Sequence, residues 1–252
     1  MQQVPRQYID FMPLFWPTWL SFVGATLPAL PHQCLACYRW PSPDALCPDC
    51  WQRFYRLPVR CHCCALALPG LSPARPICGQ CLRQPPVWRQ AVAWQDYSYP
   101  WHRLVQQWKA GQQPGLARHL ARWMRDDTRV QTLLGQADMV VPIPMSSQRL
   151  RERGYHPAAQ LAQHLHTRTP PTPALLRPQH TPSQQGLTRA QRLRNLRNAF
   201  AVAPQLRPSL HGQSVLLIDD VMTTGATFSA AAQCLLQGGA ARVHVLCFAR
   251  TP

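Results

Sequence analysis

Short apolar runs alternate with longer amphipathic segments from Ala91 to the end of the chain. Apolar runs bounded by polar residues are typical of buried strands, and apolar positions at helical spacing are typical of helices. The pattern predicts strands at Ala91–Tyr97, Asp138–Ile143, Ser214–Asp219 and Arg242–Phe248. It predicts helices at Trp101–Ala110, Leu116–Asp127, Pro157–Thr167 and Thr224–Gln237, and a proline-rich loop from Pro170 to Pro182. This alternation favours an α/β fold with an open, mostly parallel sheet, whose ligands bind beyond the carboxyl ends of the strands.

One predicted strand leads into a distinctive polar motif. The apolar run Val215–Ile218 is followed by two carboxylates, Asp219 and Asp220, and then by the turn Thr223-Thr224-Gly225-Ala226-Thr227, which opens a helix. Unpaired N–H groups at a helix N-terminus can hold a phosphate, and paired carboxylates can hold ribose hydroxyls or help to retain Mg²⁺. The alternative is a solvated aspartate pair before an ordinary capped helix. Residue type, order and context favour a phosphate-sugar site.

The charge balance is strongly basic. The chain has 26 Lys+Arg and 10 Asp+Glu residues, a formal net charge of +16. Such a balance favours anionic partners, namely polyphosphates, nucleic acid or acidic membrane surfaces. Lys109 is the sole lysine, and no acidic residue stands between Glu152 and Asp219. Arginine suits bidentate phosphate contacts, although a GC-rich genome would give the same bias.

Nine of the eleven cysteines fall between Cys34 and Cys81. They include four Cys-x-x-Cys pairs: Cys34/Cys37, Cys47/Cys50, Cys61/Cys64 and Cys78/Cys81. Two such pairs separated by a loop form a tetrahedral thiolate site, so the pattern predicts two zinc ribbons in tandem. Cys63 could replace Cys64 as a ligand, and a disulfide framework is the competing interpretation. Cys234 and Cys247 lie in apolar stretches and are expected in the core.

The chain thus divides into an apolar N-terminal segment (1–33), a tandem zinc-ribbon region (34–86) and an α/β domain (87–252). The uncharged stretch Phe11–Leu30 could be a signal peptide or membrane anchor. Pro13, Pro17 and Pro28 argue against both. We expect this segment to pack on the rest of the chain, with no stable membrane insertion and a cytoplasmic location.

Two further stretches can serve the same ligand. Val141 and Pro142 end a predicted strand that leads through a loop to Arg149 and Arg153. A loop at a strand end next to guanidinium groups can receive a pyrophosphate. Downstream, a long polar stretch carries Arg192 among several arginines and could close over a polyphosphate.

Together these motifs resemble the type I phosphoribosyltransferases and, within them, the ComF family with its GntX-like members. The residues that carry the resemblance are the four cysteine pairs, Lys109, Val141-Pro142-Ile143-Pro144, Arg153-Gly154-Tyr155, the stretch from Gln184 to Phe200, and the motif from Val215 to Thr227. The resemblance covers Cys34 to the C-terminus. It implies a small zinc-ribbon domain joined to a phosphoribosyltransferase-like sheet. One departure is His156, where the family commonly has asparagine.

The resemblance also implies roles for the site residues. Asp219, Asp220 and Arg192 would act on phosphoribosyl pyrophosphate (PRPP), with the aspartates facing the ribose hydroxyls. The Thr223–Thr227 turn would wrap the 5-phosphate, and Mg²⁺ would accompany the ligand. The remaining ligand-binding positions would be Val141, Pro142, Arg149 and Arg153.

The same resemblance links the chain to DNA uptake, or to use of external DNA as a nutrient. It supplies no acceptor substrate, so the enzyme hypothesis has a rival. In the rival, the chain is a non-catalytic adaptor that senses PRPP or handles single-stranded DNA together with DNA-uptake proteins.

Overall fold

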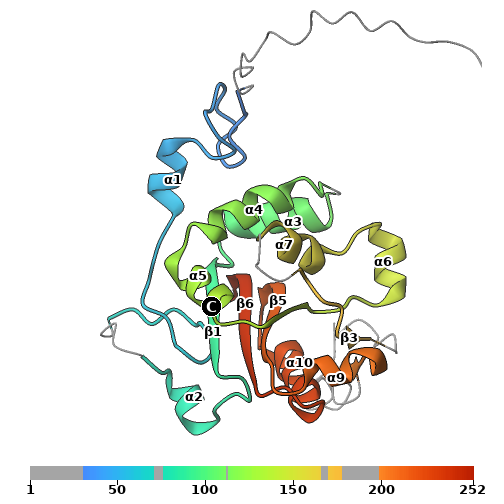
Figure 1. The fold of residues 1–252 in the computed structure, drawn as a ribbon. Coiled ribbons are helices and arrows are strands. Elements are labelled where there is room, and N and C mark those ends of the chain that lie inside the picture. Colours follow the sequence, from blue (N-terminus) through green and yellow to red (C-terminus); the bar gives the residue numbers. More distant parts are fainter. Residues whose placement is uncertain (1–30, 71–75, 112, 166–169, 178–198) are drawn as a thin grey trace, which may run out of the picture.

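The computed structural model describes residues 31–70, 76–111, 113–165, 170–177 and 199–252. Its centre is a four-stranded sheet in the order β1-β6-β5-β2, in which every neighbouring pair is parallel (Figure 1). The strands are β1 (Gln90–Asp96), β2 (Met139–Pro142), β5 (Ser214–Met222) and β6 (Arg242–Arg250). The prediction of an open parallel sheet is therefore confirmed.

Two apolar layers cover the two faces of this sheet. Successive side chains of a strand point to opposite faces, so Leu216 and Ile218 belong to one core, whereas Val215 and Leu217 belong to the other. The first core is covered by α3 (Trp101–Lys109), α4 (Leu116–Arg125), α5 (Thr128–Gly135) and α7 (Pro157–His164). The second is covered by α9 (Arg207–Leu210), α10 (Ala226–Gln237) and the short antiparallel pair of β3 (Leu175–Leu176) and β4 (Ala201–Val202). A short 3-10 helix, Pro204–Leu206, precedes α9.

Three differences from the sequence prediction affect the elements around the predicted site. Strand β5 does not end at Asp219 but continues to Met222, because β6 pairs with it as far as Arg250. Helix α10 begins two residues later than predicted, after Gly225, whose φ of 78° is left-handed. The expected loop that holds Arg149 and Arg153 is a helix, α6 (Ser147–Arg153), because the Ser146 side chain caps it by accepting from the Arg149 N–H.

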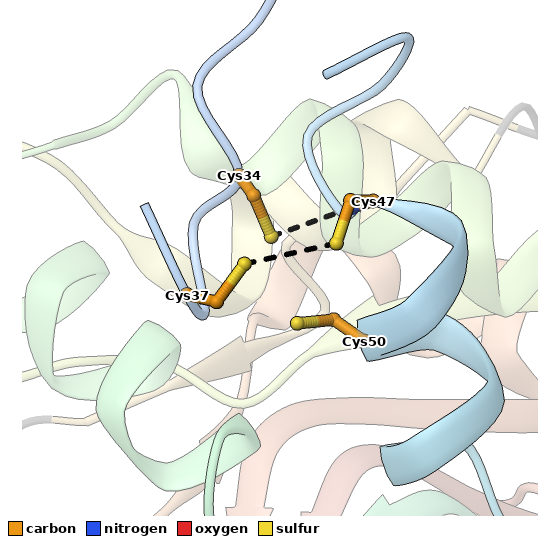
Figure 2. Close-up of side chains that lie close together, drawn as sticks. All are labelled: Cys34, Cys37, Cys47 and Cys50. Atoms are coloured by element: carbon orange, nitrogen blue, oxygen red, sulfur yellow. Dashed lines mark hydrogen bonds between the residues drawn. The ribbon is translucent and has the colours of Figure 1, made fainter. Parts of the chain in front are cut away.

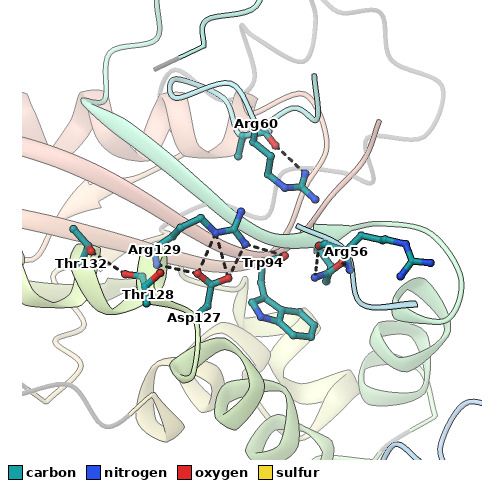
Figure 3. Close-up of polar contacts among 9 residues, drawn as sticks. Arg56, Arg60, Trp94, Asp127, Thr128, Arg129 and Thr132 are labelled. Atoms are coloured by element: carbon teal, nitrogen blue, oxygen red, sulfur yellow. Dashed lines mark hydrogen bonds and ion pairs between the residues drawn. The ribbon is translucent and has the colours of Figure 1, made fainter. Parts of the chain in front are cut away.

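Helix α5 was not predicted at all. The buried Asp127 separates it from α4 by accepting the Arg129 N–H, as an N-cap does. Figure 3 shows that the guanidinium of Arg129 also pairs with Asp127 and reaches the Trp94 carbonyl of β1. These contacts hold α5 against β1, the edge strand of the sheet. Nearby, the guanidinium of Arg60, in the cysteine-rich region, donates to the Asp96 carboxylate at 2.7 Å.

Three tryptophans that recur every seven residues are core residues. Trp94, Trp101 and Trp108 are at most 1% exposed. Trp94 contacts Trp101 edge-on and stacks against Trp123 of α4. This aromatic cluster joins β1, α3 and α4 into one layer.

One local structure occurs twice in the cysteine-rich region. Helix α1 (Pro48–Phe54) begins directly after Cys47, and α2 (Gly79–Arg83) begins directly after Cys78. Where a ribbon would have strands, the described part of this region has only two isolated bridges, His32↔Ser42 and Arg60↔Ala67. Each repeat is therefore a pair of cysteine turns, the second of which opens a short helix.

The predicted N-terminal segment lies outside the described residues, except for its last three positions. Among the helices of the described part, none has both the length and the hydropathy needed to cross a bilayer.

Candidate functional site

A cavity of about 260 Å³ lies where the predicted phosphate-sugar motif meets the ends of β2 and β5. Its lining comes from seven segments of the chain. They are the end of α3, the residues that follow β2, the helix α6, the start of α7, the residue after β3, the second half of β5 and the first turn of α10. The lining residues are Lys109, Ile143, Pro144, Met145, Arg149, Arg153, His156, Pro157, Ala158, Arg177, Asp219, Asp220 and Thr227.

The two aspartates have different surroundings. Asp220 is 8% exposed, and its Oδ1 accepts from the Lys109 Nζ at 2.6 Å. Asp219 is part exposed at the cavity, and its Oδ1 accepts from the Asp220 N–H at 2.8 Å. Burial, together with the neighbouring charge of Asp220, raises the pKa of Asp219, and the Lys109 charge partly offsets this effect. Keeping both carboxylates ionised therefore costs free energy, and a bound cation or ribose hydroxyls would offset this cost.

The residues Thr223–Thr227, called here the signature loop, join β5 to α10. The Thr224 hydroxyl accepts from the Ala226 N–H at 3.3 Å. Gly225 is the N-cap residue of the helix, and its left-handed φ is strained for any residue with a side chain. A Cβ at Gly225 would lie 3.2 Å from the ring of Trp88. Thr227 of the first helical turn lines the cavity, so the positive end of the α10 dipole faces it.

Cationic side chains also line the cavity. Arg149 and Arg153 reach it from α6, and Arg177 from the end of β3. Burial and the charge of Arg149 lower the pKa of Arg177, whose guanidinium also lies over the Phe200 ring. His156 at the start of α7 contacts the Ile143 carbonyl at 2.8 Å through Nε2, and burial lowers its pKa.

Part of this lining lies next to residues that the sequence motifs single out. Val141 and Pro142 are buried within β2, and the next three residues, Ile143 to Met145, take the expected place at the cavity. Arg177 was missed, because nothing local distinguishes it from other surface arginines. Arg192 lies outside the described residues.

The eight paired cysteines form two compact groups. The first cluster is Cys34, Cys37, Cys47 and Cys50, and the second cluster is Cys61, Cys64, Cys78 and Cys81. Within each cluster the four sulfurs lie within 4.8 Å of one another, and Figure 2 shows those of the first cluster pointing toward a common centre. Cys64, not Cys63, therefore completes the second cluster.

The donor chemistry of both clusters suits a metal ion. Although burial opposes ionisation, backbone N–H donors lower the pKa of Cys34 to about 6 and that of Cys61 to about 7. Burial and the neighbouring cysteines raise the pKa of Cys50 and Cys81. Thiolates are the ligands that zinc prefers, and a complete set of four leaves no position open for a substrate. The clusters are thus suited to a structural ion. Cys247 is fully buried and Cys234 partly so, in the core of the α10 layer.

Comparison with known proteins places the chain in a family. A family model described as a phosphoribosyl transferase domain matches residues 111–252. The DNA utilization protein YhgH of Salmonella typhimurium is 34% identical over 235 residues, which cover 90% of this chain and 99% of the relative. Competence protein F of Haemophilus influenzae is 32% identical, covering 82% of this chain and 91% of the relative. The chain belongs to the ComF family.

Two further matches cover parts of the chain. Competence protein ComFC of Bacillus subtilis is 34% identical over 107 residues, about two fifths of either chain (41% and 40%). The solved structure of the allosteric regulatory enzyme of purine biosynthesis covers 52% of this chain and 25% of its own, at 22% identity and a TM-score of 0.31. The order and direction of the strands, rather than that likeness, carry the fold assignment.

Proposed function

We propose that this ComF protein binds PRPP with Mg²⁺ in the cavity between β2, β5 and α6, and that it serves the use of DNA in the cytoplasm. The observation that carries the proposal is the convergence of an acidic pair, a helix N-terminus and several arginines on one cavity. A phosphorylated sugar bearing a pyrophosphate needs all three features. The names of the relatives, DNA utilization protein and competence protein, support the cellular role.

In this proposal, different residues of the cavity bind each part of the ligand. The 5-phosphate would meet the N–H groups of the signature loop and the α10 dipole. Asp219 and Asp220 would accept hydrogen bonds from the ribose hydroxyls, with Lys109 holding Asp220 in place. Arg149 and Arg153 would bind the pyrophosphate. Bound Mg²⁺ would add charge neutralisation on the pyrophosphate oxygens.

This arrangement would serve phosphoribosyl transfer. Positive charge that develops at the sugar C1 as pyrophosphate leaves would be stabilised by the nearby carboxylates. The arginines of α6 would stabilise the departing anion. An acceptor nucleophile aligned at C1 would complete the transfer, and the signature loop and α6 would hold the sugar in place for it.

We also propose that each cysteine cluster holds one structural zinc ion. Four closely spaced thiolates in each, with no open position, support this assignment. Elemental analysis of protein purified without chelator should then find two zinc ions per chain.

Calorimetry with PRPP and Mg²⁺ tests the site. The double variant Asp219→Asn/Asp220→Asn should bind more than about tenfold more weakly, since each hydrogen bond to a charged group contributes roughly 1.5–3 kcal/mol. The variant Asp126→Asn/Glu152→Gln removes the same charge from exposed positions and should bind normally. Absence of PRPP binding by the wild type at millimolar ligand would contradict the proposal.

A second candidate function, contact with a DNA strand, is favoured by a basic hollow of about 590 Å³. Its described lining is made of arginines and histidines from α4, α7 and the start of the first cluster: His32, Arg118, His119, Arg122, Arg125 and His164. Arg118, Arg122 and Arg125 follow one another at helical spacing on a single face of α4. Arg122 pairs with Asp44, so Arg118 and Arg125 are the better candidates for phosphate contacts.

Binding of a single-stranded oligonucleotide, followed over a range of salt concentrations, tests this second function. Arg118→Gln/Arg125→Gln should weaken binding and reduce the slope of log affinity against log salt by about 1.4, or 0.7 per lost phosphate contact. The variant Arg83→Gln/Arg207→Gln has the same net charge and should leave the slope unchanged. Equal effects of the two variants would show that only overall charge matters.

A further inference from the structure

The Cys61–Cys64 turn supplies two of the four cysteines of the second cluster. Three successive carbonyls of this turn accept hydrogen bonds from the α/β domain. The His62 carbonyl accepts from the Ala91 N–H at 3.0 Å. The Cys63 carbonyl accepts from the Trp88 Nε1, and the Cys64 carbonyl accepts from the Arg250 Nε at 3.2 Å. These donors belong to the start of β1, the segment before it and the end of β6. The turn therefore packs as part of the α/β domain rather than as a separate module.

Two of these donors also contact the signature loop or the residue before it: Trp88 lies against Gly225, and the Arg250 Nη1 donates to the Met222 carbonyl at 3.5 Å. The Trp88 ring is 7% exposed and lies directly against Gly225, where an added Cβ would meet its Cη2 at 3.2 Å. The same ring meets Phe228 of α10 edge-on, with centroids 6.5 Å apart. Next to Arg250, the Thr251 N–H donates at 2.9 Å to the carbonyl of Met222, the last residue before the loop.

The first cluster offers an internal comparison. Its Cys34–Cys37 turn accepts one hydrogen bond from the domain in the part of the chain that the structure describes, from the Tyr99 hydroxyl to the Ala36 carbonyl at 3.0 Å. That turn packs in the layer of α3 and α4, whereas Trp88 and Gly225 belong to the layer of α10. The first cluster is thus on the other side of the sheet from Trp88.

We propose that Trp88 is a positioning residue, which transmits the geometry of the Cys61–Cys64 turn to the signature loop. The second cluster then fixes the site of the ligand's 5-phosphate, and the first cluster does not. At one end of the indole, the Trp88 Nε1–H donates to the Cys63 carbonyl, and the other end of the ring lies against Gly225. A loop that binds phosphate through its backbone must be held to within a fraction of an ångström. Gly225 has no side chain with which to cap α10, so the side-chain contact at the start of the helix comes from the Thr224 hydroxyl, and Trp88 supports the loop from outside it.

This inference rests on the proposed function, so its test uses ligands that occupy the two ends of the cavity separately. Ribose 5-phosphate probes the signature loop, and magnesium pyrophosphate probes the arginines of α6. In Trp88→Ala, affinity for ribose 5-phosphate should fall by about tenfold or more, the effect of 1.4 kcal/mol. Affinity for magnesium pyrophosphate and zinc content, measured by elemental analysis, should stay at wild-type values.

Two conservative variants keep the test decisive if Trp88→Ala folds poorly. Trp88→Phe removes the hydrogen bond to Cys63 but keeps an aromatic ring, so it should lose part of the ribose 5-phosphate affinity. Tyr99→Phe removes the matching hydrogen bond to the first cluster and should change neither ligand's affinity.

The possible outcomes distinguish a failure of this inference from a failure of the proposed function. Wild-type protein that binds neither ligand would remove the proposed site, and the inference with it. Wild-type binding that Trp88→Ala and Trp88→Phe leave unchanged would overturn the inference alone. Equal losses for both ligands would assign Trp88 a general structural role and would likewise overturn it.

Discussion

The two cysteine clusters have the same ligand set and the same spacing within each pair, yet they lie in different layers of the molecule. Three cysteines of the first cluster are buried in the core that contains Trp94 and Trp101. The second forms a small core of its own, whose Cys61–Cys64 turn is bonded to Trp88 and Arg250 beside the signature loop. The same four-cysteine arrangement therefore occurs in two different surroundings. We propose that these neighbours decide whether a cluster supports the core or the binding site.

The largest effect should come from removing one cluster at a time. Cys78→Ser/Cys81→Ser should lose one zinc ion and lower affinity for ribose 5-phosphate by more than about tenfold, because the loop loses its support. Cys47→Ser/Cys50→Ser should also lose one zinc ion and should unfold at a lower temperature, since both side chains are buried in a shared core. Its folded fraction should bind ribose 5-phosphate normally. Calorimetry and thermal denaturation of both variants provide the measurement.

The comparison would fail if the two double variants lost ligand affinity equally. That result would mean that the cysteine-rich region supports the domain as a whole. Selective loss of affinity in Cys47→Ser/Cys50→Ser would reverse the assignment of the clusters.

A smaller effect should appear in the coupling between Gly225 and Trp88. Gly225→Ala should weaken ribose 5-phosphate binding, because its Cβ would meet the Trp88 ring and its φ is left-handed. In a Trp88→Phe background the ring atom nearest to that Cβ is absent, so the same substitution should cost less affinity. A double-mutant cycle by calorimetry measures the difference. Strictly additive losses would show that the indole does not control the loop.

The acidic and phosphate-binding part of the site could be predicted because its residues are contiguous in sequence. The strand, the aspartate pair and the signature loop occupy one short segment, and the cysteine spacing identifies all eight cluster residues. The Trp88–Gly225 contact could not be predicted, because it joins segments far apart in the chain. Arg177 reaches the cavity for the same kind of reason, through the pairing of β3 with β4. Helix α6 was missed because its cap, Ser146, follows a proline-rich strand end that reads as a loop.

The smallest effect concerns charge at the site rather than the clusters. The folded-state pKa of Asp219 is raised above its ordinary value of 3.8. The folded protein therefore keeps a proton that the unfolded chain has already lost, so stability falls as pH rises through the window between the two pKa values. Asp219→Asn cannot ionise and should lack this fall, which makes it at least as stable as the wild type at neutral pH.

Urea denaturation at about pH 5 and pH 8 checks this prediction. The stability gap between Asp219→Asn and the wild type should widen at the higher pH, while the exposed Asp126→Asn should show no such change. A variant that is less stable than the wild type at the higher pH would show that ionised Asp219 stabilises the empty site.

A crystal structure of the protein with PRPP and Mg²⁺ tests the central claim most directly. The account predicts the 5-phosphate against the N–H groups of Thr223–Thr227, the ribose hydroxyls at Asp219 and Asp220, and the pyrophosphate toward Arg149 and Arg153. It also predicts the Trp88 indole in place between the Cys63 carbonyl and Gly225. A ligand bound in the basic hollow beside α4, or a 5-phosphate held away from the signature loop, would contradict the account.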